Sequence, residues 1–250
     1  MLKVVLAAGG SGSRLYPMTK WVNKHLAPCG DGTLMIDYPL AFLSKSGFGD
    51  VTIVTGSNHA TQIVEYVGDG SSYGLKVDYS FQPKPAGIAD VLNRISSRHV
   101  TGVILLLADN FFSKPQCFKN LAYYQAKGWE YDIGSSEKAS AFGQAMRGED
   151  GSVCSIVEKP KNPVHSKILT GLYYFPGDVF DRVERMTPSA RNELEITGLM
   201  EMYLKDKALE INQVEGMWKD LGEWNPWQEF VGSRSGCEAD YYSLISSRRG

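Results

Sequence analysis

The sequence predicts an α/β fold, with a Rossmann-like, mostly parallel central sheet, helices on both faces and a strand-rich lobe. Three observations lead to this prediction. Strand-like and helix-like stretches alternate over the first 110 residues, which implies right-handed crossovers between parallel strands. The first strand breaks into a glycine-rich turn, VVLAAGGSGSR, from Val4 to Arg14. The remaining chain carries short alternating stretches separated by turn residues, a pattern typical of further strands.

In the first half, the expected strands are Leu2–Ala8, Asp50–Gly56, Leu75–Gln82 and Gly102–Asn110. The expected helices are Ile36–Ser46, which stops at Gly47, then His59–Val67 and Ala89–Ser97. Ligands of open parallel sheets bind beyond the carboxyl ends of the strands. The strand ends at Gly9, Gln82 and Asp109 are therefore the places where a site is expected.

In the second half, strands are expected within YDIGSS, FGQAMRG, CSIVEKP and GLYYFPG, with a hairpin turn at Glu149-Asp150-Gly151. A helix over Gly198–Lys207 and a last strand near Leu209–Val214 follow. The sequence shows no repeat, low-complexity tract or linker, so residues 1–250 are expected to form one domain with two lobes that divide near residue 110.

Composition excludes several function classes. The chain has 250 residues and a net charge of −2, so no broad basic field favours nucleic acid as a partner. The four cysteines are scattered without metal spacing, which favours reduced thiols. The N-terminal apolar run is too short for a secretory segment, and the longest apolar run, Val103 to Ala108, is too short to cross a membrane. A cytoplasmic protein without a membrane partner is expected.

The glycine-rich turn has three competing interpretations. A dinucleotide-binding fingerprint fails because Leu15 stands where its third glycine is required, and no GxxxxGK[ST] P-loop occurs. A plain tight turn explains the glycines alone. However, Arg14 and Lys24 follow closely, and bare backbone N–H groups beside fixed positive charge form an anion-binding loop. The turn is therefore interpreted as a phosphate site.

Several segments together resemble one known family. LAAGGSGSRLYPMT and NKHLAP, QPKPAGIAD, LLLADNFF, FGQAMRGEDGSVCSIVEKP, TGLYYF, SARNELEITG and WKDLGEW occur in order from Leu6 to about Trp224. They are similar to motifs of the sugar-1-phosphate nucleotidylyltransferases, and the closest branch is that of the glucose-1-phosphate thymidylyltransferases. The resemblance implies the nucleotide-diphospho-sugar transferase fold, with a nucleotide-binding lobe over 1–110, a sugar-binding lobe over 111–235 and a polar tail over 236–250.

The reaction that this resemblance implies joins a nucleoside triphosphate to a sugar 1-phosphate, with glucose 1-phosphate as the expected acceptor, and releases pyrophosphate. The sugar phosphate itself attacks the α-phosphorus, so no protein nucleophile is required. The implied catalytic residues are Arg14, Lys24, Asp109 and Lys159. The implied nucleotide-binding residues are Leu6, Ala8, Gly9, Gly10, Ser11, Gly12, Ser13, Arg14, Gln82, Pro85, Gly87 and Asp109.

The resemblance also implies a metal and a sugar site. Asp109 and Asp220 would bind Mg²⁺, a hard cation that suits two carboxylates and phosphate oxygens. Glu158 would hold sugar hydroxyls and Lys159 the sugar phosphate. The full set of implied sugar-phosphate residues is Asn110, Gly143, Glu158, Lys159, Thr170, Gly171, Arg191 and Glu195.

Base preference is expected to depend on Gln82. Its amide offers both a donor and an acceptor, which match the N3–H and carbonyl of thymine or uracil. Gly87 would let the backbone approach the base, where a side chain would collide. This favours dTTP or UTP without separating the two.

The chain departs from the branch pattern mainly on the sugar side. Asp90-Val91, Phe142, Gln144 and Gly198 replace family residues, while the phosphate and metal residues persist. Two alternatives therefore stay open: the same chemistry with CTP or another triphosphate and a different small phosphate or phosphonate, or a non-catalytic regulatory protein that binds the nucleotide sugar. The chain is expected to be a short form without the family's C-terminal helices and regulatory nucleotide site. Because members of this family commonly form homo-oligomers, the resemblance implies that this chain can form one.

Overall fold

The computed structural model describes residues 1–30, 32–118, 121 and 124–233; the expected polar tail, 236–250, lies outside them. Within this part, seven strands form the central sheet in the order β12-β8-β11-β6-β1-β4-β5. Neighbours pair in parallel at β1–β4, β4–β5 and β12–β8, and antiparallel at β11–β8. The predicted α/β class with a mostly parallel sheet is confirmed. No helix among the described residues is long and apolar enough to span a membrane.

The chain divides into two compact units, each assembled from three chain segments. We call the first the loop unit, which comprises Val4–Pro85, Leu106–Cys117 and the described residues from Glu215 onward. We call the second the hairpin unit, which comprises Met1–Lys3, Ala86–Leu105 and Phe118–Val214. The two are described separately below.

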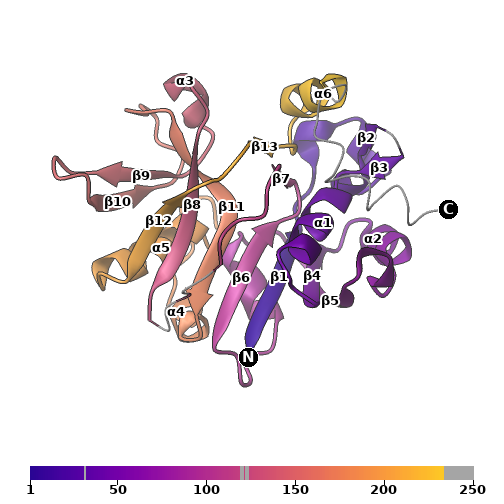
Figure 1. The fold of residues 1–250 in the computed structure, drawn as a ribbon, viewed down its shortest axis with the longest axis horizontal. Helices are drawn as coiled ribbons and strands as arrows, with labels where there is room; N and C mark the ends of the chain where they lie inside the picture. Colours follow the sequence, from indigo (N-terminus) through magenta and orange to yellow (C-terminus); the bar gives the residue numbers. More distant parts are fainter. Residues whose placement is uncertain (31, 119–120, 122–123, 234–250) are drawn as a thin grey trace. The chain divides into compact units, whose positions relative to one another are not determined.

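The parallel strands of the loop unit are β1 (Leu2–Ala8), β4 (Asp50–Gly56) and β5 (Lys76–Gln82). Helix α1 (Asp37–Lys45) and helix α2 (Ala60–Val67) accompany them (Figure 1). These bounds agree with the predicted elements to within one residue. The agreement has a physical cause for β1 and β4, because both faces of these two strands are buried and their apolar runs end abruptly at glycine or polar residues.

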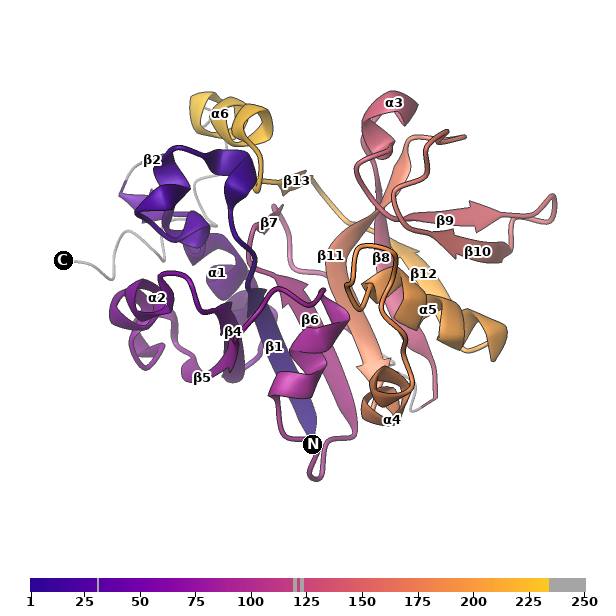
Figure 2. The same cartoon turned by 180° about the vertical axis from the view of Figure 1, so that it is seen from behind.

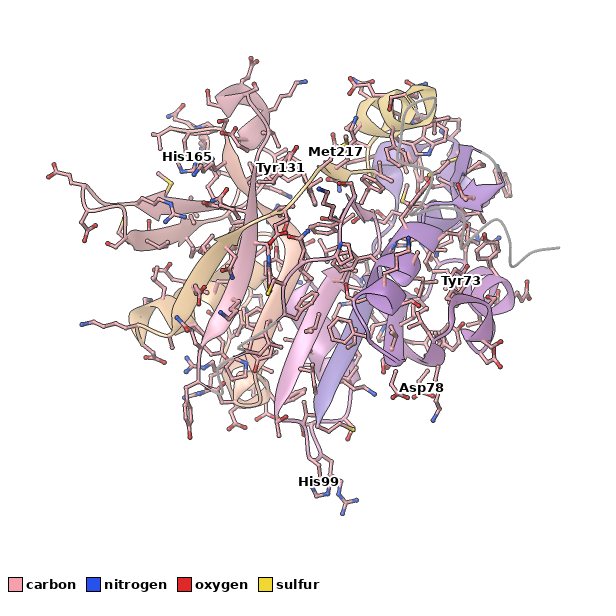
Figure 3. All side chains as sticks on the ribbon, in the orientation of Figure 1. Tyr73, Asp78, His99, Tyr131, His165 and Met217 are labelled. Atoms are coloured by element: carbon pink, nitrogen blue, oxygen red, sulfur yellow. The ribbon has the colours of Figure 1, made fainter. Side chains whose placement is uncertain are left out.

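A buried carboxylate anchors α1 in the loop unit. Asp37 is fully buried, and it accepts hydrogen bonds from the backbone N–H of Leu34 at 2.7 Å and from the hydroxyl of Tyr73 at 2.5 Å. The Tyr66 hydroxyl also donates to Asp37, at 2.9 Å. Tyr73, labelled in Figure 3, belongs to a short 3-10 helix, η4 (Ser71–Tyr73). These bonds satisfy a charge whose burial would otherwise be costly.

The expected strand over Gly102–Asn110 is in fact two strands. Strand β6 (Gly102–Leu107) ends before the two polar residues, and β7 (Asn110–Phe112) begins after a turn. Strand β7 leaves the central sheet and pairs antiparallel with β13 (Trp218–Asp220). Asp109 therefore lies in the turn between two strands, with its backbone available to the segment that follows β13.

Helix α6 (Trp224–Gly232) was not predicted from the sequence. Phe230 is its fully buried residue, and its ring lies 5.2 Å from that of Tyr38 and 4.8 Å from that of Phe111, measured between centroids. Figures 1 and 2 both show α6 beside β2 (Pro28–Gly30), which pairs with β3 (Thr33–Leu34). Three further 3-10 helices in this unit are η1 (Ser13–Leu15), η2 (Met18–Lys20) and η3 (Lys24–Leu26).

In the hairpin unit, β8 (Ala126–Asp132) lies between β11 (Lys167–Pro176) and β12 (Leu209–Gln213). The hairpin of β9 (Gln144–Arg147) and β10 (Val153–Val157) forms as expected, with Gly148 and Gly151 bonded across its turn. The helices are α3 (Ser136–Ala139), α4 (Val179–Glu184) and α5 (Ile196–Lys205).

Two predicted elements of the hairpin unit are wrong in part. The strand expected within YDIGSS ends at Asp132, whose side chain accepts from Gly134 N–H, and Ser135 then caps α3 by accepting from Lys138 N–H. The helix expected over Ala89–Ser97 is a 3-10 helix, η5 (Ala89–Arg94). Its first N–H, of Ala89, is held by the carbonyl of Leu194 rather than by a preceding helical turn.

Candidate functional site

The glycine-rich turn follows β1 in the loop unit. Gly10 and Gly12 have φ angles of 94° and 66°, a region that favours glycine. The carbonyl of Gly12 accepts from the Thr19 hydroxyl at 2.6 Å. A Cβ on Gly12 would lie 3.1 Å from the Thr19 side chain and 3.2 Å from that of Lys24. The turn is thus shaped by positive φ angles and by close approach of neighbouring side chains.

The two predicted cations reach the site from short helices after the turn. Arg14 lies in η1 and Lys24 begins η3, whose preceding residue, Asn23, caps it by accepting from His25 N–H at 3.0 Å. The Lys24 ammonium lies 2.6 Å from a carboxylate oxygen of Asp109. A Cβ placed on Gly10 would lie 3.9 Å from this ammonium nitrogen. Positive charge therefore lies against the turn.

The pairing of β7 with β13 brings Asp109 and Asp220 together, although 111 positions separate them in the sequence. Asp220 is opposite Asn110 in the register, and Leu221 N–H donates to the Asp109 carbonyl at 2.8 Å. A Cβ on Gly222 would lie 2.8 Å from Asp109 Oδ2 and 3.0 Å from Asp220 Oδ1. The two carboxylates therefore converge on one side of Gly222, and only glycine leaves both of them room.

The charges of this cluster are unevenly shared. Burial opposes the ionisation of Asp109, but the charge of Lys24 and the hydrogen bonds of Lys24 and Asn110 hold its pKa well below the ordinary value. Burial and the nearby negative charge of Asp109 raise the pKa of Asp220 to about 6. Burial lowers the tendency of Arg14 to be charged, but Asp220 and Glu223 raise its pKa above the ordinary value. Lys24 thus compensates Asp109 directly, whereas the weaker effects of Lys24 and Arg14 on Asp220 do not offset its burial and the charge of Asp109.

This arrangement fits a hard divalent cation. Two partly desolvated carboxylates face each other, and the raised pKa of Asp220 shows that added positive charge would stabilise its ionised form. No group of three or more histidine, cysteine, aspartate or glutamate side chains suited to a metal occurs in the described part of the chain. A cation bound here would complete its shell with oxygens from water and a phosphate ligand, as Mg²⁺ commonly does.

Some residues of this cluster were missed or given another role by the sequence. Asn110 was expected to bind the sugar phosphate, yet it is buried, donates to Asp109 at 3.1 Å and accepts from the indole N–H of Trp218 at 2.7 Å. In this structure it orients the carboxylate. Glu223, which pairs with Arg14 at 2.5 Å, was not singled out, because its partner is 209 positions away.

Gln82, the expected base-reading residue, ends β5 and is buried. Its side-chain oxygen would lie 3.1 Å from a Cβ on Gly9, so the amide is beside the glycine-rich turn. Leu6 and Ala8 are buried within β1, and Pro85 is exposed. The structure gives a second reason for Gly87 besides the expected approach of the base, since a side chain there would collide with the backbone of Leu194. A contact within the hairpin unit by itself explains this glycine, whose φ is 97°.

The hairpin unit gathers most of the residues expected to bind a sugar phosphate. Glu158, which follows β10, accepts from Arg191 at 2.9 Å and from the hydroxyl of Thr197 at 3.1 Å. Arg191 also pairs with Glu195 at 2.8 Å. Burial opposes the charge of Arg191, but its bonds to the two glutamates raise its pKa. Burial and the charge of Glu158 raise the pKa of Tyr173. Thr197, in the first turn of α5, is a member of this cluster that the sequence did not indicate.

Of the remaining sugar-side residues, some lie near the Glu158 carboxylate and the others lie within β11. A Cβ on Gly143 would lie 2.8 Å from the Thr197 methyl carbon and 3.5 Å from Glu158 Oε2. The Lys159 ammonium is 3.9 Å from Glu158, with the side chain 47% exposed. Thr170 and Gly171 are buried in β11, and the Thr170 hydroxyl donates to the carbonyl of Trp129 at 2.9 Å. Thr170 therefore supports the sheet, while Glu158, Lys159 and Arg191 offer polar groups to a ligand.

Comparisons with known proteins identify the relatives of this chain. The family model described as nucleotidyl transferase matches residues 3–231. A glucose-1-phosphate thymidylyltransferase of Neisseria meningitidis is 36% identical over 232 residues, which cover 88% of this chain and 78% of that relative. The enzyme of the same name from Mycobacterium tuberculosis is 32% identical over 254 residues, covering 100% of this chain and 85% of that relative.

Solved structures show the same fold. A crystal structure of a candidate glucose-1-phosphate thymidylyltransferase from Bacillus anthracis, in complex with a sucrose, matches with a TM-score of 0.85 and 33% identity. The match covers 97% of this chain and 99% of that one. A UDP-glucose pyrophosphorylase complexed with UDP-glucose matches with a TM-score of 0.79 at 22% identity, which supports likeness of fold alone.

Proposed function

The chain belongs to the nucleotidyl transferase family, and from this premise we propose that it joins a nucleoside triphosphate to a sugar 1-phosphate. The products are a nucleoside diphosphate sugar and pyrophosphate. The observation that carries the proposal is the cluster of the loop unit: Lys24 lies against the glycine-rich turn and pairs with Asp109, Asp109 and Asp220 converge at Gly222, and Arg14 interacts with Asp220. This set combines an anion-binding turn, two cations and a pair of carboxylates, which are the parts that phosphoryl-type transfer requires.

The chemistry needs no protein nucleophile. An oxygen of the sugar phosphate forms a bond to the α-phosphorus of the triphosphate, and the bond from that phosphorus to the bridging oxygen breaks, so pyrophosphate leaves with the electron pair. In the proposal, the backbone N–H groups from Gly9 to Gly12 and the guanidinium of Arg14 hold the phosphates. Lys24 stabilises the negative charge that develops around the α-phosphate. Catalysis is then positioning combined with charge compensation.

Asp109 and Asp220 are the residues that would hold Mg²⁺. When bound, this ion would neutralise phosphate charge and favour departure of the pyrophosphate. Lys24 and Asn110 keep Asp109 ionised and oriented through bonds of 2.6 and 3.1 Å. A cation bound beside Asp220 would favour its ionised form, since burial and the charge of Asp109 raise its pKa to about 6.

The proposal assigns the second substrate to the hairpin unit. Glu158 accepts hydrogen bonds from sugar hydroxyls, and Lys159 compensates the sugar phosphate. Arg191 pairs with both Glu158 and Glu195, which supports a role of Arg191 and Glu195 as the rim of this site. The single domain is accordingly divided into a nucleotide-binding and a sugar-binding part. The proposed setting is the cytoplasm, with small-molecule substrates and no nucleic acid.

Arg191→Ala is expected to raise the KM for glucose 1-phosphate about tenfold while the KM for the nucleotide stays within about twofold. The reason is that removal of the guanidinium leaves Glu158 and Glu195 without their shared cation, and at a side chain that is 42% exposed the loss of these charge-assisted bonds is expected to cost up to about 1.5 kcal/mol. Steady-state kinetics with each substrate varied in turn measures both constants. Arg98→Ala, at an exposed position of the same unit, is the control. An equal rise of both KM values would contradict the assignment of Arg191 to the sugar side.

Gln82→Leu is expected to reduce the preference for dTTP and UTP over CTP by about tenfold, because leucine of similar size offers neither donor nor acceptor to the base. Relative kcat/KM for the three nucleotides measures the change. A preference that is unchanged in this variant would show that other groups read the base.

The test of the proposed function is pyrophosphate release with Mg²⁺, crossing dATP, dTTP, UTP, CTP and GTP against a panel of sugar 1-phosphates. Turnover of dTTP or UTP with glucose 1-phosphate would support the full proposal. Turnover of another pair would support the reaction type but assign it different substrates. The departures from the family pattern at Asp90, Phe142, Gln144 and Gly198 are compatible with that outcome. Binding of a nucleotide sugar with no turnover for any pair would favour the regulatory protein instead.

A further inference from the structure

Glu223 is the first residue after the Asp220-Leu221-Gly222 segment and immediately precedes α6. Its side chain forms no capping bond with that helix. Instead, its carboxylate accepts from Nη1 of Arg14 at 2.5 Å. A residue at the start of the C-terminal helix is therefore paired with the arginine that follows the glycine-rich turn.

Two further bonds connect α6 to the segment after the turn. The indole N–H of Trp224 donates to the carbonyl of Tyr16 at 2.9 Å, and that of Trp227 donates to the carbonyl of Pro28 at 3.1 Å. Phe230 anchors the same helix in the buried cluster that includes Leu15. Side chains from one helix turn thus hold the chain from Arg14 to Pro28 at three places, of which only the Glu223 contact reaches a phosphate-binding side chain.

The Glu223 contact leaves most of the guanidinium available. A guanidinium has five N–H donors in a fixed plane. Among the described residues, the Arg14 side chain forms one hydrogen bond, through Nη1. Four donors, including the edge made by Nε and Nη2, remain for a ligand. Because Arg14 and Glu223 are 55% and 39% exposed, the pair adds little to stability, and its main consequence is to limit the orientations of the guanidinium.

We propose that Glu223 is a positioning residue for nucleotide binding: it fixes the Arg14 guanidinium by one N–H and thereby presents the remaining donors to the triphosphate. The inference rests on the proposed function, since it assigns the ligand of Arg14 as the phosphates of the nucleotide. The opposite role is a clear alternative. If Glu223 instead competed with phosphate for Arg14, its removal would strengthen nucleotide binding.

The test is calorimetric titration of dTTP and UTP, each with Mg²⁺, into the full chain and its variants. Glu223→Ala is expected to weaken nucleotide binding about threefold to fivefold, in keeping with a partly exposed ion pair. Glu223→Gln is expected to be intermediate, because its amide oxygen still accepts from Arg14. In steady-state kinetics the same variants should raise the KM for the nucleotide and leave kcat and the KM for the sugar phosphate within about twofold.

A double-mutant cycle separates positioning from a general structural role. In an Arg14→Ala background, Glu223→Ala should have no further effect on nucleotide affinity, since Glu223 acts through Arg14. Glu229→Ala, at an exposed position of the same helix, is the control, and thermal unfolding checks that every variant is folded.

The outcomes separate this inference from the proposed function. Three results would each overturn the positioning role: tighter nucleotide binding by Glu223→Ala, unchanged binding by that variant, or an undiminished effect of Glu223→Ala in the Arg14→Ala background. In each of these cases, nucleotide binding by the unmodified chain would still uphold the proposed function. If the unmodified chain binds neither dTTP nor UTP nor another nucleoside triphosphate, the proposed function fails, and this inference fails with it.

Discussion

Asp109→Asn is expected to lower the rate of pyrophosphate release by roughly 100- to 1000-fold, the loss typical of removing a group that stabilises charge in the transition state. The asparagine keeps the size of the side chain and can still accept from Asn110. It removes the negative charge that Lys24 contacts at 2.6 Å and that would bind a cation together with Asp220. The measurement is kcat at saturating dTTP and glucose 1-phosphate over a range of Mg²⁺ concentrations.

The matched control is Asp78→Asn. Asp78 is exposed on β5, and Figure 3 shows its side chain directed away from the body of the loop unit. This substitution removes the same charge from the chain without touching the cluster, so turnover should be unchanged. Equal activity of Asp109→Asn and the unmodified chain would contradict the role of the carboxylate, whereas loss in both variants would point to net charge.

Asp220→Asn is expected to lower turnover by a similar factor and, in the metal-free protein at pH 7.5, to raise the free energy of unfolding by roughly 1 to 2 kcal/mol. Burial and the charge of Asp109 raise the pKa of Asp220 to about 6, above its unfolded value of 3.8. The folded state therefore favours the protonated form. Its stabilising contribution is complete below pH 3.8 and is lost as the pH rises through about 6.

Comparing the unmodified chain with Asp220→Asn isolates the titration of Asp220 from that of all other groups. With chelator present, the stability of the unmodified chain relative to Asp220→Asn should decline between about pH 4 and pH 6 and level off above that range. Denaturant unfolding at each pH measures the difference. Addition of Mg²⁺ should stabilise the unmodified chain more than the variant. A variant that is less stable than the unmodified chain at pH 7.5 would refute the repulsion between the two carboxylates.

Local patterns were sufficient for most of the regular elements. The bounds of β1 and β4 agree with the sequence, because an apolar run buried on both faces ends where polar or glycine residues begin. The helix over Gly198–Lys207 corresponds to α5 (Ile196–Lys205) within two residues. Predictions were poorer where a contact between residues far apart in the sequence determines whether an element forms or where it ends. Helix α6 depends on Phe230 packing against Tyr38 and Phe111, and the end of β6 depends on the pairing of β7 with β13.

The sequence by itself determined the kinds of groups in the site, because the glycine-rich turn, its following cations and the motif carboxylates are local patterns that can be recognised without coordinates. Only the tertiary structure decided which of these groups meet. Asp220 reaches Asp109 because β13 pairs with β7, and Glu223 reaches Arg14 because α6 packs beside β2. It also decided how their charges differ: one aspartate has a lysine 2.6 Å away and the other does not, so equal side chains acquire opposite shifts of pKa. Such effects depend on distance and burial in space, to which spacing along the chain gives no direct access.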